Sequence, residues 1–292
     1  MDLTREQMVF AAGLAFHQLA GNSQGNLDGA HSKRLGPGFA AYDAILSARL
    51  AQRGVAGARR VLEGAKGLYK QYHGGRYARE ELLDGLGTHY AGVEVAPKPY
   101  PSCRGGHNAI DAALALRAQG RLRPADIEAV TLSIGPGEFG LLGAPLDRKR
   151  RPPSVVDAQF SNPWMVAAAL IDGEVTLRHF TPAALQREDL LAFTQRIQTV
   201  EDTSLGRPGG GPGAVHVAIR MTDGRVHERR ATLAKGDPQN PMTAEEMSRK
   251  FLDCSNAGGL QAGHAAALLQ RLQQIDAEVD VAALVNAMAA PC

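Results

Sequence analysis

Aromatic residues and cysteines are scarce in this chain of 292 residues. Phe, Trp and Tyr make up 5% of it, so the core must be built mainly from Ala, Leu, Val and Ile. The three cysteines, Cys103, Cys254 and Cys292, are widely spaced and form no CxxC pair. This pattern argues against a disulfide framework and a zinc site, and it fits a reducing cytoplasm.

The sequence also lacks long apolar runs and an excess of charge. No stretch approaches the roughly 18 consecutive apolar residues of a membrane span. Asp2, Arg5 and Glu6 do not form the positive start of a signal peptide. Lys plus Arg (32) nearly cancels Asp plus Glu (30), which argues against a dedicated nucleic-acid-binding protein. We expect a cytoplasmic protein with no membrane or nucleic-acid partner.

Motifs for metals and nucleotides are missing as well. The nine histidines show no HxxxH or HExxH spacing, and there is no EF-hand, no GxSxG, and no GxGxxG after a strand. The glycine-rich stretch 206–213 lacks the Lys-Ser/Thr of a phosphate loop, so we interpret it as a flexible hairpin connection. We therefore expect no metal and no cofactor, and insensitivity to chelators.

The first 95 residues have a helical pattern. Thr4–Gln7 forms a capping box that opens an amphipathic helix ending near Gly21. Further helices are predicted over 39–53, 61–72 and 80–86. Their high alanine content predicts close helix packing, typical of one side of a bundle that needs partner helices.

The pattern changes in the middle of the chain. Residues 127–134 alternate apolar and polar side chains as a half-buried strand does, between predicted helices over 108–117 and 156–171. Residues 214–221 and 225–233 flank an Asp-Gly turn and predict a hairpin. This mixture indicates an α/β domain.

The chain ends in helices again. Thr243–Glu246 is a second capping box, which opens a helix to about Asp253, and two more helices follow to Met288. The predicted fold class is α+β. A mostly helical domain (1–95 and 236–292) carries an inserted α/β domain (96–235).

The densest polar cluster runs from Lys98 to His107. It brings Lys98, Cys103, Arg104 and His107 to the start of the helix predicted from Asn108. Cations and a helix N-terminus attract carboxylates, and His can move protons near neutral pH. The alternative is a stiff loop with solvated charges and a capping His.

Two other clusters precede helices. Residues 32–38 are cationic, with Lys33 and Arg34, and residues 157–164 contain Gln159, Ser161 and the single Trp164. Each alone is more typical of a solvated cap or a buried anchor. The basic run 148–151 is interpreted as a solvated loop.

In this order the clusters resemble the MmgE/PrpD family, which includes 2-methylcitrate dehydratase, cis-aconitate decarboxylase and iminodisuccinate epimerase. The matching stretches are SKRLGPGFAAYDAILSARLAQRGVAGARRVLEG, KPYPSCRGGHNAIDAALAL, DAQFSNPWMVAAALIDG and GDPQNPMTAEEMSRKF. The resemblance implies a cofactor-free homodimer in which an α/β lid covers a helical domain. The substrate, a small carboxylate, would bind in the cleft between them.

The resemblance also implies site residues. The family lysines fall on Lys33 and Lys98, and a family His falls on His107, whereas another family His falls on Gly36. Cys103 stands where aconitate decarboxylases have His, a departure that argues against decarboxylation. The substrate-binding residues implied are Arg104, Gln159, Ser161 and Trp164.

The implied activity is that of a lyase or isomerase acting on a small di- or tricarboxylate. Removing the proton alpha to a carboxylate requires a base, for which His107 is the candidate, and cations that stabilise the developing charge, Lys33 and Lys98. Cys103 is a proton donor or part of the pocket wall. Family members are longer by roughly half, and the missing part is N-terminal. The alternatives are therefore an impaired partial member that assembles with another chain, and an iminodisuccinate epimerase-like isomerase.

Overall fold

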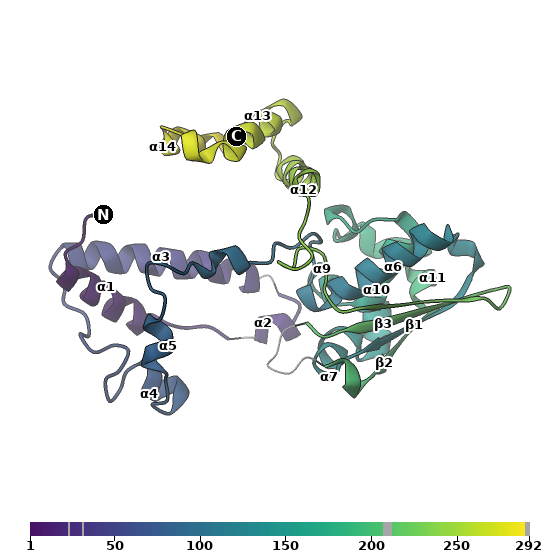
Figure 1. Cartoon of the computed structure of the whole chain (residues 1–292), viewed down its shortest axis with the longest axis horizontal. Coiled ribbons are helices and arrows are strands. Elements are labelled where there is room, and N and C mark those ends of the chain that lie inside the picture. Colours follow the sequence, from purple (N-terminus) through teal and green to yellow (C-terminus); the bar gives the residue numbers. More distant parts are fainter. Residues whose placement is uncertain (23, 31, 207–211, 290–292) are drawn as a thin grey trace. The chain divides into compact units, whose positions relative to one another are not determined.

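The computed structural model describes residues 1–22, 24–30, 32–206 and 212–289 (Figure 1). The chain divides into two compact units, Met1–Ala91 and Gly92–Cys292. Most of the glycine-rich stretch 206–213, interpreted from the sequence as a hairpin connection, lies outside the described residues, as does Cys292. Cys103 and Cys254 are free thiols.

The first unit is helical. Its helices are α1 (Arg5–His17), α2 (Gln24–Leu27), α3 (Ser32–Gln52), α4 (Leu68–His73) and α5 (Arg79–Leu83), followed by the short η1 (Ala91–Glu94). The predicted capping box is confirmed, because Thr4 N donates to Gln7 Oε1 and Gln7 N donates to Thr4 Oγ1. The helix it opens ends at His17, earlier than predicted. Helix α1 packs against α3.

Helix α3 begins seven residues earlier than predicted. Residues 32–38 were expected to be a loop ahead of the helix, and this expectation was wrong. Pro37 lies inside α3, where it removes only one hydrogen bond close to the helix start. The alanine-rich sequence that follows favours the helix strongly enough to outweigh this loss. Lys33 therefore belongs to the first turn of α3.

The second unit contains a four-stranded mixed sheet. Its strands are β1 (Ile127–Ile134), β2 (Ile197–Glu201), β3 (Val215–Met221) and β4 (Val226–Ala231), in the spatial order β2-β1-β3-β4. β1 is parallel to β2, pairing Val130 with Ile197, and antiparallel to β3. The predicted β1 and the β3–β4 hairpin are confirmed. Strand β2 was not predicted from the sequence.

Helices cover one face of this sheet (Figure 1). Helix α6 (His107–Gly120) and helix α10 (Asn162–Asp172) pack against each other and, with β1 and β3, form the main hydrophobic core. Every residue of α10 from Asn162 to Leu170 is buried. One continuous helix over 156–171 had been predicted. Instead α9 (Val155–Gln159) ends before Ser161 caps α10, with Pro163 in its first turn.

The remaining elements are short. They are η2 (Arg104–Gly106), η3 (Pro124–Asp126), α7 (Pro136–Glu138), η4 (Phe139–Gly143), α8 (Leu146–Arg150), η5 (Leu177–His179), η6 (Ala184–Gln186), α11 (Glu188–Thr194), η7 (Thr203–Leu205) and η8 (Ile275–Ala277). The basic run in α8 is not a solvated loop as expected. Lys149 Nζ donates to Leu141 O and Phe160 O, and the Arg150 guanidinium donates to Ile197 O. These cations tie α8 to its neighbours.

The chain ends with α12 (Ala244–Ala257), α13 (Ala262–Gln273) and α14 (Val281–Ala287), in agreement with the three predicted helices. The Thr243–Glu246 capping box is present. The predicted return of residues 236–292 to the first helical domain concerns the arrangement of the two units and stays a prediction. Over the described ranges, no helix is both long and apolar enough to cross a membrane.

Candidate functional site

The Lys98–His107 segment leads into α6 and is held in place by the end of α9. Cys103 N donates to Gln159 O at 2.9 Å, and Gln159 Nε2 donates to Pro101 O at 2.8 Å. Two of the residues that the sequence analysis selected, Cys103 and Gln159, are therefore neighbours although 56 positions separate them. This double attachment fixes the middle of the segment.

Three cations lie within or beside this segment. Lys98 is exposed, and its Nζ donates to Ser102 O at 3.3 Å. Arg104 Nη1 donates to Lys235 O at 2.8 Å. Lys149 Nζ donates to Phe160 O, the residue after Gln159, and burial lowers the pKa of Lys149. Such a concentration of positive charge favours an anionic ligand.

His107 is the first residue of α6 and is fully buried. Its ring meets the Tyr100 ring edge-on, with centroids 5.1 Å apart. Burial, followed by the positive charges of Arg104 and Lys98, lowers the pKa of His107 to about 3. The backbone of Ser102 offsets this shift in part, although it makes no hydrogen bond of good geometry to Nε2. His107 is thus neutral at pH 7.

Arg104 defines which ring nitrogen of His107 carries the hydrogen. Arg104 Nη1 lies 3.3 Å from His107 Nδ1. A guanidinium can only donate, so Nδ1 accepts and Nε2 carries the hydrogen. In this state the only lone pair of the imidazole is engaged. His107 can act as a base only when Arg104 leaves Nδ1.

Unsatisfied polar atoms gather at the same place. Within the described part of the chain, the buried atoms without a hydrogen-bond partner are Ser102 Oγ, His107 Nε2, Asn108 Oδ1, Asn162 Nδ2 and Asn162 Oδ1. Ser102, Asn108 and Asn162 were not predicted as site residues. For Asn108 and Asn162 the available signal was a polar side chain in the first turn of an otherwise apolar helix, whereas Ser102 lies in the loop before η2.

Tyr100 and Asp111 join this segment to residues 234–237. Tyr100 OH donates to Asp111 Oδ1 at 2.6 Å, and Lys235 N donates to Asp111 Oδ2 at 2.6 Å. Burial raises the pKa of both Tyr100 and Asp111. Gly236, at φ +86°, comes so close to Pro97 that a Cβ would lie 2.1 Å from Pro97 O. The chain after β4 is therefore fixed beside the candidate site.

The structure places Ser161 and Trp164 in the interior. Ser161 Oγ accepts from Trp164 N and donates to Lys149 O. Trp164 is fully buried, and its Nε1 donates to His179 O at 3.0 Å. In this arrangement both residues anchor α10. Their predicted contact with substrate stays a prediction.

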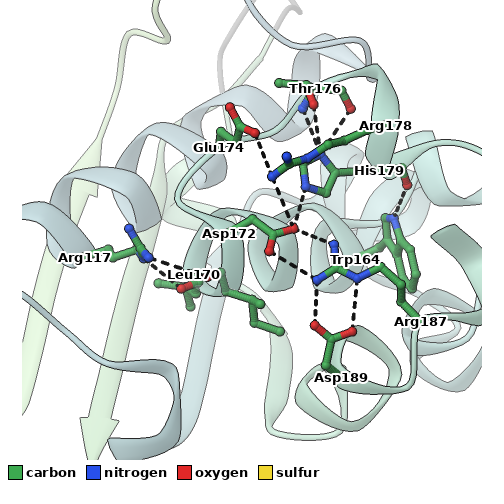
Figure 2. Close-up of polar contacts among 11 residues, drawn as sticks. Arg117, Trp164, Leu170, Asp172, Glu174, Thr176, Arg178, His179, Arg187 and Asp189 are labelled. Carbon is green, nitrogen blue, oxygen red and sulfur yellow. Dashed lines mark hydrogen bonds and ion pairs between the residues drawn. The ribbon is translucent and has the colours of Figure 1, made fainter.

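A second polar network, partly exposed and built around the buried His179, lies at the other end of α10 (Figure 2). Asp172 accepts hydrogen bonds from Arg187 Nη1 at 2.6 Å and from His179 Nε2 at 2.8 Å. Thr176 N donates to His179 Nδ1, so that both nitrogens of this buried ring are paired. The hydrogen bonds from Arg187 lower the pKa of Asp172 to about 2.

The other predicted site residue, Lys33, belongs to the first unit. It is exposed on α3. Its convergence with Lys98 and His107 on one pocket stays a prediction, because they belong to the second unit. A pocket of about 260 Å³ in the second unit is lined by residues that include Tyr100, Lys235 and Arg249, but not by Lys98, Cys103 or His107. Among the described residues, no group of three His, Cys, Asp or Glu could hold a metal ion.

Comparison with known families identifies the chain. Residues 1–96 match the MmgE/PrpD N-terminal domain, and residues 100–274 match the MmgE/PrpD C-terminal domain. The chain belongs to the MmgE/PrpD family. The observed α+β architecture, with a mixed sheet in the second unit, is consistent with this membership.

Its curated relatives include cis-aconitate decarboxylases. The cis-aconitate decarboxylase-like protein oryM of Aspergillus oryzae is 26% identical over 264 residues, covering 86% of this chain and 53% of the relative. The Aspergillus terreus cis-aconitate decarboxylase is 25% identical with the same coverage. The Mus musculus enzyme is 25% identical over 75% of this chain and 45% of its own length. This chain thus spans about half the length of these relatives.

Proposed function

We propose that this chain is a lyase or isomerase that acts on a small di- or tricarboxylate by removing a proton alpha to a carboxylate. The observation that carries the proposal is the grouping of Lys98, Arg104 and Lys149 around the start of α6. Membership of a family whose curated members include lyases supports it. In a dehydration, His107 takes the proton of the broken C–H bond, whose electron pair forms the C=C bond. The C–O bond breaks, and the hydroxyl group leaves as water with a proton from Cys103 or from the protonated His107.

In this proposal the cations bind the carboxylates. Lys98, exposed at the start of the segment, binds one carboxylate, and Lys33 binds a second across a cleft that the α/β domain covers as a lid. Arg104 pairs with the substrate instead of His107 Nδ1. That exchange frees the lone pair, and the bound negative charge raises the pKa of His107, so that it accepts the proton. Cys103 forms the pocket wall or returns a proton, and Gln159 positions the segment.

The test measures binding and turnover on the purified chain. We expect citrate and 2-methylcitrate to raise the melting temperature, and Lys98→Met to weaken their binding about tenfold. Lys70→Met, on α4, is the matched control and should bind as the wild type does. His107→Gln should keep binding and lose turnover. A chain that no di- or tricarboxylate stabilises would overturn the proposal.

A second candidate function is a partial enzyme completed by assembly, either with itself or with another chain. Within the first unit, α3 exposes Leu35, Phe39, Tyr42 and Ile45, each by about half or more. A continuous apolar stripe of this kind marks an interaction surface. The observation fits a homodimer. Light scattering should show a dimer for the wild type and a monomer for Phe39→Glu, because the new charge disrupts the apolar contact. A monomeric wild type with full turnover would contradict this candidate.

A further inference from the structure

The pocket of about 260 Å³ in the second unit takes one wall from α12 and is here called the α12 pocket. Its other walls come from the Lys98–His107 segment, from α6 and from the turn after α10. Ligand pockets typically measure roughly 300–1,000 Å³, so this volume suits a small ligand. Because Lys98, Cys103 and His107 do not line it, the proposed reaction leaves this pocket without a role.

Much of the wall of the α12 pocket is apolar. The apolar lining residues are Pro99, Pro101, Leu114, Val175, Leu177 and Met242. Val175 is 3% exposed and Leu177 is 37% exposed, so this wall extends from the core to the surface. Tyr100 also lines the pocket, but its hydroxyl already donates to Asp111 Oδ1. A ligand that fills the pocket therefore gains by burying an apolar body.

Charged side chains line the rest of the pocket, and two of the acids are already compensated. Glu246 pairs with Lys235 Nζ at 2.9 Å. Glu174 pairs with Arg178 at 2.7 Å. These acids and the cation Lys235 therefore add no net charge that a ligand would have to neutralise.

The other charged lining residues all belong to α12. Arg249, Lys250 and Asp253 form no ion pair with any described residue. Lys250 is half-buried, whereas Arg249 and Asp253 are exposed. Two cations and one acid remain, which gives the α12 pocket one positive charge in excess. A ligand with a single negative charge and an apolar body matches both this charge and the apolar wall.

We propose that the α12 pocket binds a small monocarboxylate with an apolar body. Lys250 pairs with the carboxylate, and the apolar body packs against Leu114 and Val175. A di- or tricarboxylate does not fit, because its further charges would be buried against the apolar wall without a partner. The inference therefore goes beyond the proposed function and does not depend on it.

A ligand in the α12 pocket also contacts the candidate site segment. Residues 99–101 line the pocket, and the Tyr100 ring meets the His107 ring edge-on. The ligand binds only when this wall is in place, so binding stabilises the position of the segment. The Cys103 amide donates to Gln159 O. We expect its hydrogen exchange to slow when the ligand is bound.

The test uses phenylacetate and phenylacetamide, which share a ring and a size but differ in charge. By isothermal titration, we expect phenylacetate to bind the wild-type chain about tenfold more tightly than phenylacetamide. Lys250→Met should reduce this preference to less than about threefold and leave phenylacetamide binding unchanged. Lys70→Met, exposed on α4, is the matched control and should keep the preference. Citrate should not displace phenylacetate.

A second variant tests the pocket itself. Leu177→Trp places a larger side chain at the exposed end of the apolar wall, where it occupies part of the pocket. Both ligands should bind about tenfold more weakly, and the melting temperature should stay as in the wild type. Val200→Trp is the matched control, because Val200 is 47% exposed and lies outside the pocket. It should bind both ligands as the wild type does.

The contrary outcomes are distinguishable. Failure of phenylacetate to bind, or equal binding of phenylacetate and phenylacetamide, would overturn the inference and leave the proposed function standing. Displacement of phenylacetate by citrate would mean that one site takes both ligands, which also overturns it. Unchanged exchange of the Cys103 amide at saturating phenylacetate, or unchanged binding by Leu177→Trp, would show that the ligand binds outside the α12 pocket. A preference that survives in Lys250→Met would overturn the pairing of Lys250 with the carboxylate.

Discussion

Among the described residues, His107 and His179 are the fully buried histidines, and they lie near opposite ends of α10 in contrasting environments. His179 has both ring nitrogens paired, with Asp172 and with the Thr176 backbone (Figure 2). His107 pairs only Nδ1, through Arg104, and its Nε2 has no hydrogen-bond partner within the described part of the chain. The two rings are therefore equally buried, but they differ in how many of their nitrogens have a hydrogen-bond partner.

The contrast indicates what each end of α10 does. Asp172, His179 and Arg187 form a network in which the polar atoms of the buried His179 ring are satisfied and the charges of Asp172 and Arg187 compensate each other, which contributes to stability. The cluster around His107 is kept at a cost to stability. Such a cost is typical of a binding site, where the ligand supplies the missing partners.

The largest expected effect comes from breaking the satisfied network. Asp172→Ala leaves the His179 Nε2–H and the Arg187 guanidinium without their acceptor, so we expect the free energy of unfolding to fall by about 3 kcal/mol. Urea denaturation measures it. Glu174→Ala, which removes an exposed partner of Arg178, is the control and should cost less than about 0.5 kcal/mol. Equal losses in the two variants would contradict the contrast.

The next effect concerns the pH dependence of the free energy of unfolding, which should differ between the groups at the two ends of α10. His107 has a pKa of about 3 in the folded chain, against an ordinary value of 6.5. Its contribution to the stability of the folded chain is therefore fully present above pH 6.5 and is lost as the pH falls toward 3. We expect a loss of about 2 kcal/mol between pH 7 and pH 5. Asp172, with a pKa of about 2, keeps its contribution above about pH 4 and loses it as pH falls through 2.

Chemical denaturation at pH 7 and pH 5 tests this dependence. In His107→Gln, whose amide does not titrate, most of the loss between these two pH values should disappear. In Asp172→Asn it should remain, because Asp172 does not titrate in this range. If His107→Gln lost as much unfolding free energy between pH 7 and pH 5 as the wild type does, groups other than His107 would be responsible for the loss.

Local patterns in the sequence predicted much of this fold. The two capping boxes, the alternating strand β1 and the Asp-Gly hairpin are set by neighbouring residues, and each is confirmed. Strand β2 was missed because only Ile197 of its five residues is buried, which leaves no clear alternation. The start of α3 was misplaced because Pro37 and its neighbouring glycines are typical of a loop.

The candidate site was predictable only in part. The polar density of the Lys98–His107 segment is visible in the sequence, whereas its attachment to Gln159 is not, because the contact joins distant positions. The full burial of His107 depends on the packing of α6 against α10. Asn108 and Asn162 carry no motif. Their importance lies in the partners they lack, which only the packed structure shows.

The smallest expected effect compares two buried hydroxyls of the same unit. Thr194 Oγ1 is near Arg150 O and Leu191 O, at 2.9 and 2.8 Å, and is therefore satisfied. Ser102 Oγ has no partner among the described residues. Thr194→Val should lower the free energy of unfolding by about 1 kcal/mol, because a buried hydrogen bond is lost. Ser102→Ala should change it by less than about 0.5 kcal/mol, since no hydrogen bond is broken.

Because both side chains are almost fully buried, denaturation curves of the two variants isolate the effect of hydrogen bonding. A loss in Ser102→Ala as large as that in Thr194→Val would mean that Ser102 Oγ has a structural hydrogen-bond partner, and it would contradict this comparison.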